Sequence, residues 1–357
     1  MHPFLRYTLF VFETIVFGPA YAYLNQLVRV KEPLHAERAW SLITEPWHPS
    51  IEWFRKNYPP YFIRKILMWW MLRPKHDQGI ENHYDVSNEF FESFLDKRFL
   101  FYSCADFLHP NDTLEDAQTR KANHLLGMLD PNPGEKILEL GPGWGSMLRL
   151  VYSVTGDKQN LHSYTLSKKQ IAFNRERENF NMEYRDFITT DYPNEFFDKI
   201  YSVAVSEHVR PQDIEPWMKK LAGAVKPGGR IVKHFFCLAN DTTPVSAVAG
   251  QLIFPGSELS SHHRWCQAIE DAGLLIERHT VHDYRPTLKA WYFNLARNRE
   301  QAIEAANVYQ YNRFLVFIAG TYRFFDDGEA KVYRFKITKP IVNPSTPRVP
   351  VELDHES

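Results

Sequence analysis

Beyond about residue 115 the sequence alternates amphipathic segments of ten or more residues with short apolar runs. The longer segments carry apolar residues at helical spacing, and turn-forming residues bound the short runs. The predicted helices cover residues 114–129, 168–178 and 212–225. The predicted strands cover residues 136–140, 161–165, 182–190, 199–205 and 230–236. This alternation indicates a mainly parallel sheet with helices on both faces.

The last third of the chain has a different pattern. Helices are predicted over residues 287–306 and 309–325, and residues 332–338 alternate apolar and polar positions like an antiparallel edge strand. The predicted fold is therefore α/β: a doubly wound, Rossmann-like sheet with an antiparallel final strand and a helical N-terminal extension. The expected domains are the extension, the sheet domain and a short tail, over residues 1–75, 76–345 and 346–357.

The N-terminal extension is aromatic and dotted with basic residues. Its stretch over residues 7–28 is apolar but contains Glu13, whereas a spanning helix needs about 20 mostly apolar residues. Further on, Lys65 stands close to Trp69 and Trp70, a combination typical of the lipid–water interface. Three alternatives stay open: the extension spans a membrane, lies on its surface, or packs against the sheet domain.

Composition narrows the range of functions. A formal net charge of -1 gives no general affinity for nucleic acid, so no such partner is expected. Aromatic residues make up 15% of the chain, which suits an apolar pocket or a membrane-facing surface as well as a filled core. The cysteines, Cys104, Cys237 and Cys266, are too few and too scattered for a disulfide framework or a zinc site. No metal is expected, and a reducing cytoplasm is the expected location.

A glycine-rich turn follows the first predicted strand. Glu139 and Leu140 precede Gly141, Gly143 and Gly145, which stand at every second position. Such glycines let the backbone pass close to a ligand at the start of a helix. The spacing differs from the G-x-G-x-x-G of dinucleotide-binding proteins, which disfavours a nicotinamide oxidoreductase. The acidic residue before the turn suits an ammonium group, so an adenosyl cofactor with an amino-acid tail fits better.

Two further segments are expected at the same edge of the sheet. Asp191 follows the third predicted strand, where a carboxylate could accept a hydrogen bond from an adenine amino group. Thr165 and Ser167 follow the second strand, with Gln170 one turn later, where ribose hydroxyls need partners. The simpler alternatives are a turn residue for Asp191 and a helix N-cap for Thr165 or Ser167.

A series of motifs resembles the cyclopropane-fatty-acyl-phospholipid synthase family, which includes the mycolic acid methyltransferases. The resemblance covers roughly residues 75–340. The motifs lie at residues 83–91, 102–105, 113–118, 141–145, 165–167, 206–209, 226–229, 253–256 and 287–292. The resemblance implies transfer of a methyl group from S-adenosylmethionine to a cis double bond, followed by removal of a proton from the resulting cation by a bound bicarbonate.

The resemblance also assigns residues to each role. The bicarbonate holders would be Cys104, Glu207, His234, Tyr292 and the backbone of Phe236. The residues expected to bind S-adenosylmethionine are Tyr84, Tyr102, Ser103, Glu139, Gly141, Gly143, Gly145, Thr165, Leu166, Ser167, Gln170, Asp191 and Tyr192. Ser206 and Arg210 depart from the family pattern near the methyl-transfer site, so a cyclopropane ring and a methyl branch stay open as products.

The expected substrate is an unsaturated phospholipid acyl chain, and the expected location is the cytoplasm, in peripheral contact with a membrane surface. The resemblance is also compatible with a homodimer. One alternative is a methyltransferase of a small soluble acceptor such as an amine, which needs neither lipid nor bound anion. Another is a non-catalytic lipid- or nucleoside-binding module, against which the full set of Glu207, His234 and Tyr292 argues.

Overall fold

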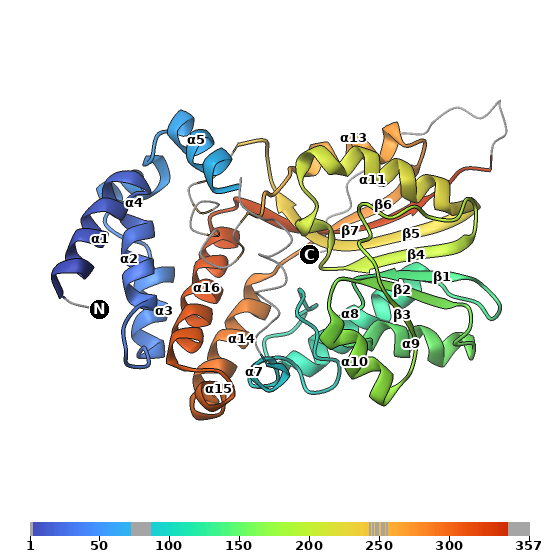
Figure 1. The fold of residues 1–357 in the computed structure, drawn as a ribbon, viewed down its shortest axis with the longest axis horizontal. Coiled ribbons are helices and arrows are strands. Elements are labelled where there is room, and N and C mark those ends of the chain that lie inside the picture. The colour runs from blue at the N-terminus through green and yellow to red at the C-terminus, as the bar shows by residue number, and fades with distance from the viewer. Residues whose placement is uncertain are drawn as a thin grey trace. The chain divides into compact units, whose positions relative to one another are not determined.

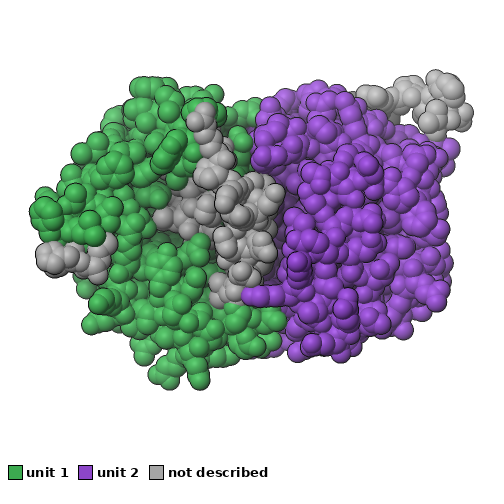
Figure 2. All heavy atoms as spheres, viewed as in Figure 1, with its two compact units in different colours: residues 1–95, 241–258, 285–329 green, residues 96–240, 259–284, 330–357 purple. Residues whose placement is uncertain are grey.

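The computed structural model describes residues 3–72, 87–242, 244, 246, 250, 254 and 256–341. The chain divides into two compact units, each built from discontinuous segments (Figure 2). Unit 1 comprises residues 1–95, 241–258 and 285–329, and unit 2 comprises residues 96–240, 259–284 and 330–357. The predicted domain borders at residues 75 and 345 stay a prediction.

Unit 2 contains one seven-stranded sheet in the order β3-β2-β1-β4-β5-β7-β6. The strands are β1 (Ile137–Leu140), β2 (Leu161–Thr165), β3 (Asn181–Tyr184), β4 (Phe197–Val203), β5 (Val225–Leu238), β6 (Leu275–His282) and β7 (Ala330–Thr338). Strands β1 to β5 pair in parallel, whereas β7 runs antiparallel to both β5 and β6. The predicted fold class, with its antiparallel final strand, is confirmed.

Helices cover the two faces of this sheet (Figure 1). On one face lie α11 (Pro211–Ala224) and α13 (His262–Asp271), and on the other lie α8 (Leu114–Leu129), α9 (Ser146–Thr155) and α10 (Lys168–Arg177). A short 3-10 helix, η1 (Ser206–His208), follows β4. The crossings from β1 to β3 therefore run over one face and the crossing from β4 to β5 runs over the other, as in a doubly wound sheet.

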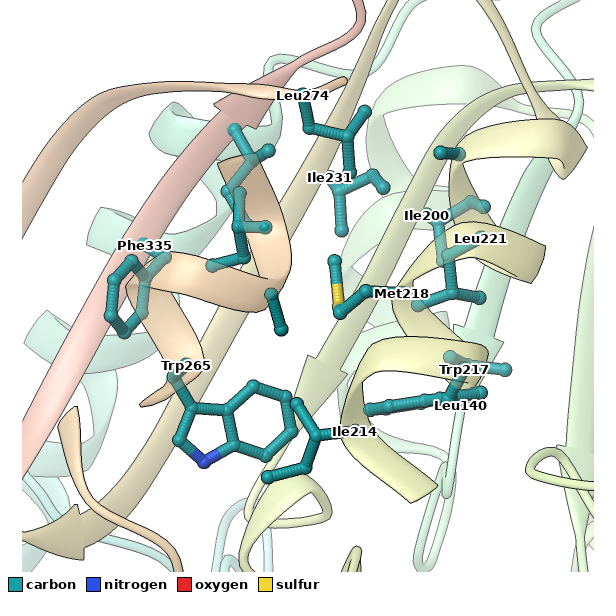
Figure 3. Close-up of a cluster of buried hydrophobic side chains, with 14 of the residues drawn as sticks. Leu140, Ile200, Ile214, Trp217, Met218, Leu221, Ile231, Trp265, Leu274 and Phe335 are labelled. Atoms are coloured by element: carbon teal, nitrogen blue, oxygen red, sulfur yellow. The ribbon is translucent and has the colours of Figure 1, made fainter. Parts of the chain in front are cut away.

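The core between the sheet and α11 and α13 is built from large apolar side chains (Figure 3). Trp217 and Leu221 of α11 and Trp265 of α13 belong to one cluster with Ile231 of β5 and Phe335 of β7, and all five are nearly or fully buried. A second apolar cluster fills the opposite face, where α8 and α9 cover β1. Both faces of the sheet are thus buried, as expected for parallel strands that helices cover on both sides.

Unit 1 is helical over its described residues. Its helices are α1 (Pro3–Val16), α2 (Pro19–Val28), α3 (Ala36–Thr44), α4 (Pro49–Asn57), α5 (Tyr61–Leu72), α7 (Asn88–Glu92), α14 (Arg285–Arg297), α15 (Arg299–Ala305) and α16 (Val308–Asp326). Its centre is aromatic: Phe90 of α7 and Phe314 of α16 meet edge to face, with ring centroids 4.8 Å apart. No helix among the described residues combines the length and hydrophobicity that a membrane crossing requires.

Three details differ from the sequence prediction. The strand predicted over residues 182–190 ends at Tyr184, because the chain turns at Asp186, whose carboxylate accepts from the Ile188 amide at 2.9 Å. The helix predicted over residues 287–306 is divided at Asn298 into α14 and α15. The sequence prediction also missed α13 and β6, so the sheet has a further edge strand beyond β7.

Candidate active site

The glycine turn lies at the carboxyl end of β1, as predicted. Gly141, Gly143 and Gly145 have φ values of 66°, 56° and 78°, a region that side chains rarely adopt. A Cβ at Gly141 would clash with Val205, whereas a Cβ at Gly143 would meet no described atom within 4 Å. Helix α9 begins directly after Gly145 and has no acidic residue in its first turn. The turn thus combines an open backbone surface with the N-terminus of a helix.

Glu139 is the buried acidic residue next to this turn. Only 2% of its surface is exposed, and its Oε2 accepts a hydrogen bond from Tyr201 Oη at 2.9 Å. Burial raises the pKa of Glu139 to about 8, against the opposing effects of the Tyr201 hydrogen bond and of Arg149. A cation placed beside Glu139 would stabilise the ionised carboxylate, so the residue is suited to bind an ammonium group.

The residues after β2 form one hydrogen-bonded turn. Thr165 Oγ1 donates to Gln170 Oε1 at 3.1 Å and accepts from the Ser167 amide at 3.1 Å. Ser167 is the N-cap of α10, since its hydroxyl accepts from the Gln170 amide at 3.2 Å. The predicted residues Thr165, Leu166, Ser167 and Gln170 therefore lie together in one turn. Ser167 is also a helix N-cap, so that simpler interpretation is confirmed as well.

The predicted adenine partners lie differently. The Asp191 side chain is fully exposed, and its nearest cation is Lys220 at 4.0 Å. Tyr192 donates from its hydroxyl to the carbonyl of Phe187. The first acidic residue after β3 is instead Asp186, which accepts from the Ile188 amide at 2.9 Å and from Thr189 Oγ1 at 2.7 Å. Asp186 does not stand out in the sequence, because the predicted strand over residues 182–190 runs through it.

Ser103 joins the buried polar interior near α8. Its hydroxyl accepts from Lys121 Nζ at 2.8 Å, and its carbonyl accepts from Gln118 Nε2 at 3.0 Å. Lys121 is fully buried with Nζ 3.4 Å from the ring centre of Phe101, and burial lowers its pKa to about 7. Tyr102 is half-buried beside Ser103. Tyr84 lies outside the described residues.

Glu207 follows β4 after a sharp change in the backbone. Ala204 has a φ of 55°, which is unusual for a residue with a side chain, and its amide donates to the His234 carbonyl at 2.7 Å. The next residues form η1, which contains Glu207. The Oε2 of Glu207 is buried and has no hydrogen-bond partner among the described residues. Burial raises the pKa of Glu207 to about 8, although Lys233 opposes the rise.

His234 lies on β5, next to that backbone contact, in a network of charged groups. Its Nδ1 accepts a hydrogen bond from Arg334 Nε at 3.1 Å. Arg334 also binds both carboxylate oxygens of Asp106, at 2.6 and 2.9 Å, and His282 Nδ1 lies 3.4 Å from Asp106 Oδ1. Burial alone would raise the pKa of Asp106, but hydrogen bonds from His282 and Arg334 hold it far below its usual range. Burial, and then Arg334, lower the pKa of His234 well below its usual value.

Cys104 and Phe236 belong to the same unit. Cys104 is 1% exposed, its Sγ lies 3.5 Å from the carbonyl oxygens of Ala105 and Asp283, and burial raises the pKa of its thiol. The charges of Arg334 and Lys121 lower the pKa of both Cys104 and His234, so the four residues lie near one another. Phe236 lies on β5 in register with Val332 of β7.

Tyr292 belongs to unit 1. It is fully buried on α14, its hydroxyl donates to the Ala36 carbonyl at 2.7 Å, and its ring lies 4.7 Å from that of Trp40. The oxygen keeps lone pairs that can accept a hydrogen bond. The role assigned to Tyr292 stays a prediction, as do the roles of Cys104, Glu207, His234 and Phe236.

The matches to known proteins agree with this geometry. A family model described as mycolic acid cyclopropane synthetase matches residues 72–335. A probable fatty acid methyltransferase from Pseudomonas putida is 31% identical over 289 residues, which cover 75% of this chain and 72% of that protein. Hydroxymycolate synthase MmaA4 from Mycobacterium tuberculosis is 30% identical over 275 residues, which cover 70% of this chain and 88% of that protein.

Solved structures show the same fold. Mycolic acid cyclopropane synthase CmaA1, complexed with SAH and CTAB, is similar with a TM-score of 0.65 and 25% identity, over 74% of this chain and 99% of that chain. The cyclopropane synthase MmaA2 from Mycobacterium tuberculosis has a TM-score of 0.66 and 24% identity, over 74% of this chain and 99% of that chain.

The fold is a doubly wound sheet with a glycine turn after β1 and a buried acidic residue before that turn. Together with these matches, it defines an S-adenosylmethionine-dependent methyltransferase. The chain belongs to the mycolic acid cyclopropane synthetase family. The resemblance stated from the sequence motifs is thereby confirmed.

Proposed function

We propose that this protein transfers a methyl or methylene group to the double bond of an unsaturated phospholipid acyl chain at a membrane surface. The product is a cyclopropane or methyl-branched chain, and a bound bicarbonate acts as the base. The observation that carries the proposal is the buried Glu207 carboxyl group, which has an unpartnered oxygen. It lies in the loop directly after β4, where the Ala204 amide donates to the His234 carbonyl. A buried polar group without a partner is costly unless a ligand satisfies it.

The cofactor fits the turn after β1. The open surface over Gly143 leaves room for a ligand against the backbone, and Glu139 would hold the amino group of its methionine tail. Asp186 stands at the carboxyl end of β3, where the adenine of a nucleoside ligand is expected in this fold, and it is a better placed acceptor than the fully exposed Asp191. When bound, S-adenosylmethionine supplies the electrophilic methyl group.

The anion site would be formed by donors that are already oriented. Arg334 donates to Nδ1 of His234, so the histidine proton is on Nε2 and can be donated to bicarbonate. Burial raises the pKa of Glu207 to about 8, so its carboxyl group can exchange a proton with a bound bicarbonate near neutral pH, which an amide in its place cannot do. Cys104 and the Phe236 backbone complete the set in unit 2.

Unit 1 offers a surface for lipid. Along α5, residues Phe62, Ile66, Trp69 and Trp70 are 57% to 65% exposed, and Lys65 is exposed on the same helix. These positions recur every three to four residues, so they share one face of α5. Exposed Trp beside Lys is the combination that binds at the headgroup level of a bilayer. Helices α1 and α4 add further exposed apolar side chains, including Phe4, Phe12 and Trp53.

The test is an assay with purified protein and methyl-labelled S-adenosylmethionine. Vesicles of monounsaturated phospholipid, vesicles of saturated phospholipid and a panel of small amines are offered as acceptors. The proposal predicts label in the acyl chains of the unsaturated lipid alone, at a rate that rises when bicarbonate is added. Label transferred to an amine, with none in lipid, would replace the proposal by the small-acceptor alternative.

A further inference from the structure

A second cluster of chemically active side chains lies on the α11 and α13 face of the sheet. His262 and Cys266 stand four residues apart on α13, so they share one face of that helix, and His279 lies on the adjacent strand β6. One ligand atom from each residue lies within 4.8 Å of the other two. We propose that His262, Cys266 and His279 bind one zinc ion.

The distances suit a single ion. His262 Nε2 lies 3.4 Å from Cys266 Sγ. Zinc bonds of about 2.1 Å to nitrogen and about 2.3 Å to sulfur, at a tetrahedral angle, place the two ligand atoms about 3.6 Å apart. The pair is therefore already close to its metal-bound spacing. Imidazole nitrogen and thiolate sulfur are both ligand types that zinc binds, and three protein ligands leave the fourth tetrahedral position for water.

His279 supplies an independent observation. The residue is 7% exposed, and both of its ring nitrogens are buried without a hydrogen-bond partner among the described residues. An imidazole buried in this way loses its hydrogen bonds to water and gains none in return. A metal ion would satisfy one nitrogen directly.

The surroundings hold the ligands in place. The His262 ring stacks on Tyr333 of β7 with centroids 4.1 Å apart and planes 21° apart, and it meets His279 edge to face at 5.0 Å. Such packing fixes the direction in which the His262 nitrogens point. The ion would join α13 to β6, the edge strand of the sheet, and would stabilise that edge.

This site is separate from the proposed active site. Lys233, Phe335 and His279 form one row across β5, β7 and β6, and Lys233 Nζ lies 3.7 Å from the Trp217 ring centre of α11. The next row contains His234 and Arg334, and Arg334 contacts His124 of α8 on the opposite side of the sheet. Because side chains alternate along a strand, the two rows face opposite sides of the sheet. The sequence prediction of no metal rested on the cysteine count, whereas this site draws one cysteine and two histidines from two elements.

The experiment uses untagged, full-length protein stripped with a chelator. Equilibrium dialysis gives the amount of zinc bound per chain, and cobalt is used as a spectroscopic probe. We expect one zinc ion per chain, and a cobalt complex with a thiolate charge-transfer band and the intense visible bands of tetrahedral coordination. Cys266→Ser should abolish the charge-transfer band, and both it and His279→Gln should weaken zinc binding by more than about tenfold.

His263→Gln is the matched control, because His263 is the exposed neighbour of His262 on the same helix. Circular dichroism of the metal-free variants checks that each is folded. A wild-type cobalt complex without a thiolate band would overturn the proposal, even if a variant failed to fold. Loss of zinc in His263→Gln equal to that in Cys266→Ser would overturn it as well.

Discussion

Arg334 of β7 donates a hydrogen bond from Nε to Nδ1 of His234 on β5, at 3.1 Å, and the two residues are direct partners in the antiparallel register. An arginine side chain has no acceptor and keeps its charge in proteins. Nδ1 of His234 must therefore be unprotonated and accept through its lone pair, so the ring is neutral with its proton on Nε2. Asp106 holds the other side of the guanidinium through two hydrogen bonds.

The first prediction concerns Arg334→Lys. A lysine has no planar fork, so it cannot bind both oxygens of Asp106 and also donate to His234. We expect kcat to fall at least about tenfold while the affinity for S-adenosylmethionine stays within about twofold, because orientation is lost and the cofactor turn is untouched. Nitrogen NMR of His234 should show mixed tautomers.

Arg230→Lys is the control for this exchange, since Arg230 lies on the same strand as His234 and donates to the carbonyls of Met128 and Leu129. An unchanged His234 tautomer in a folded Arg334→Lys protein would contradict the positioning role. Breaking a buried ion pair costs about 3–5 kcal/mol, so thermal unfolding of both variants is measured alongside.

The second prediction is a pH dependence of cofactor binding. Burial raises the pKa of Glu139 to about 8, so the carboxyl group is protonated below that pH and ionised above it. If only the carboxylate binds the ammonium group, the affinity for S-adenosylmethionine falls about tenfold per pH unit below pH 8. Calorimetric titrations between about pH 6 and pH 8 measure this rise of cofactor affinity with pH. In Glu139→Gln the rise should vanish, and a rise that persists there would show that another group is responsible.

The third prediction separates ligand space from backbone strain. Gly143 and Gly156 have φ values of 56° and 67°, and a Cβ at either one meets no described atom within 4 Å. Gly143→Val and Gly156→Val therefore carry similar backbone strain, but only the first fills the proposed cofactor surface. We expect Gly143→Val to lose more than about a hundredfold in cofactor affinity and Gly156→Val to lose little. Equal losses of cofactor affinity in the two variants would count against the proposed cofactor site.

The fourth prediction tests the lipid surface of α5. Trp69 and Trp70 are each 57% exposed, and burying one such side chain in a bilayer stabilises binding by about 1.5–3 kcal/mol. The Trp69→Ser, Trp70→Ser double variant should bind anionic vesicles at least about tenfold more weakly in a flotation assay. Leu108→Ser, which removes an exposed apolar residue of unit 2, should bind like the wild type. Unchanged binding of the double variant would remove α5 from the proposed contact.

Much of the fold was predictable, because the strands of the sheet are short apolar runs between amphipathic helices. The strand over residues 161–165 is found as predicted, and α8 begins and ends at the predicted residues, Leu114 and Leu129. The glycine turn was also predictable, since positive φ values there require glycine. Strand β6 was missed because its central residues are charged or polar, among them Glu277, Arg278 and His279.

The charged network around His234 was not predictable from local pattern. Arg334 occupies a polar position of the alternating strand β7, which usually indicates a solvent-exposed face. Here α8 covers that face, and Arg334 is fully buried with Asp106, which lies 228 positions earlier in the chain. The pairing depends on tertiary contacts alone. The same reason explains Asp186, whose place at the end of β3 becomes visible only when the strand is seen to end at Tyr184.

The most direct test of the central claim is mass spectrometry of lipids from a host that expresses the wild type or Glu207→Gln while supplied with methyl-labelled methionine. The account predicts labelled acyl chains, heavier by one methylene group, in the wild-type host, and almost none with Glu207→Gln, although both purified proteins bind S-adenosylmethionine equally. Chromatography against standards then distinguishes a ring from a branch. Equal labelling by the two proteins would contradict the role of Glu207, and no labelled lipid with a folded, cofactor-binding wild type would contradict lipid alkylation itself.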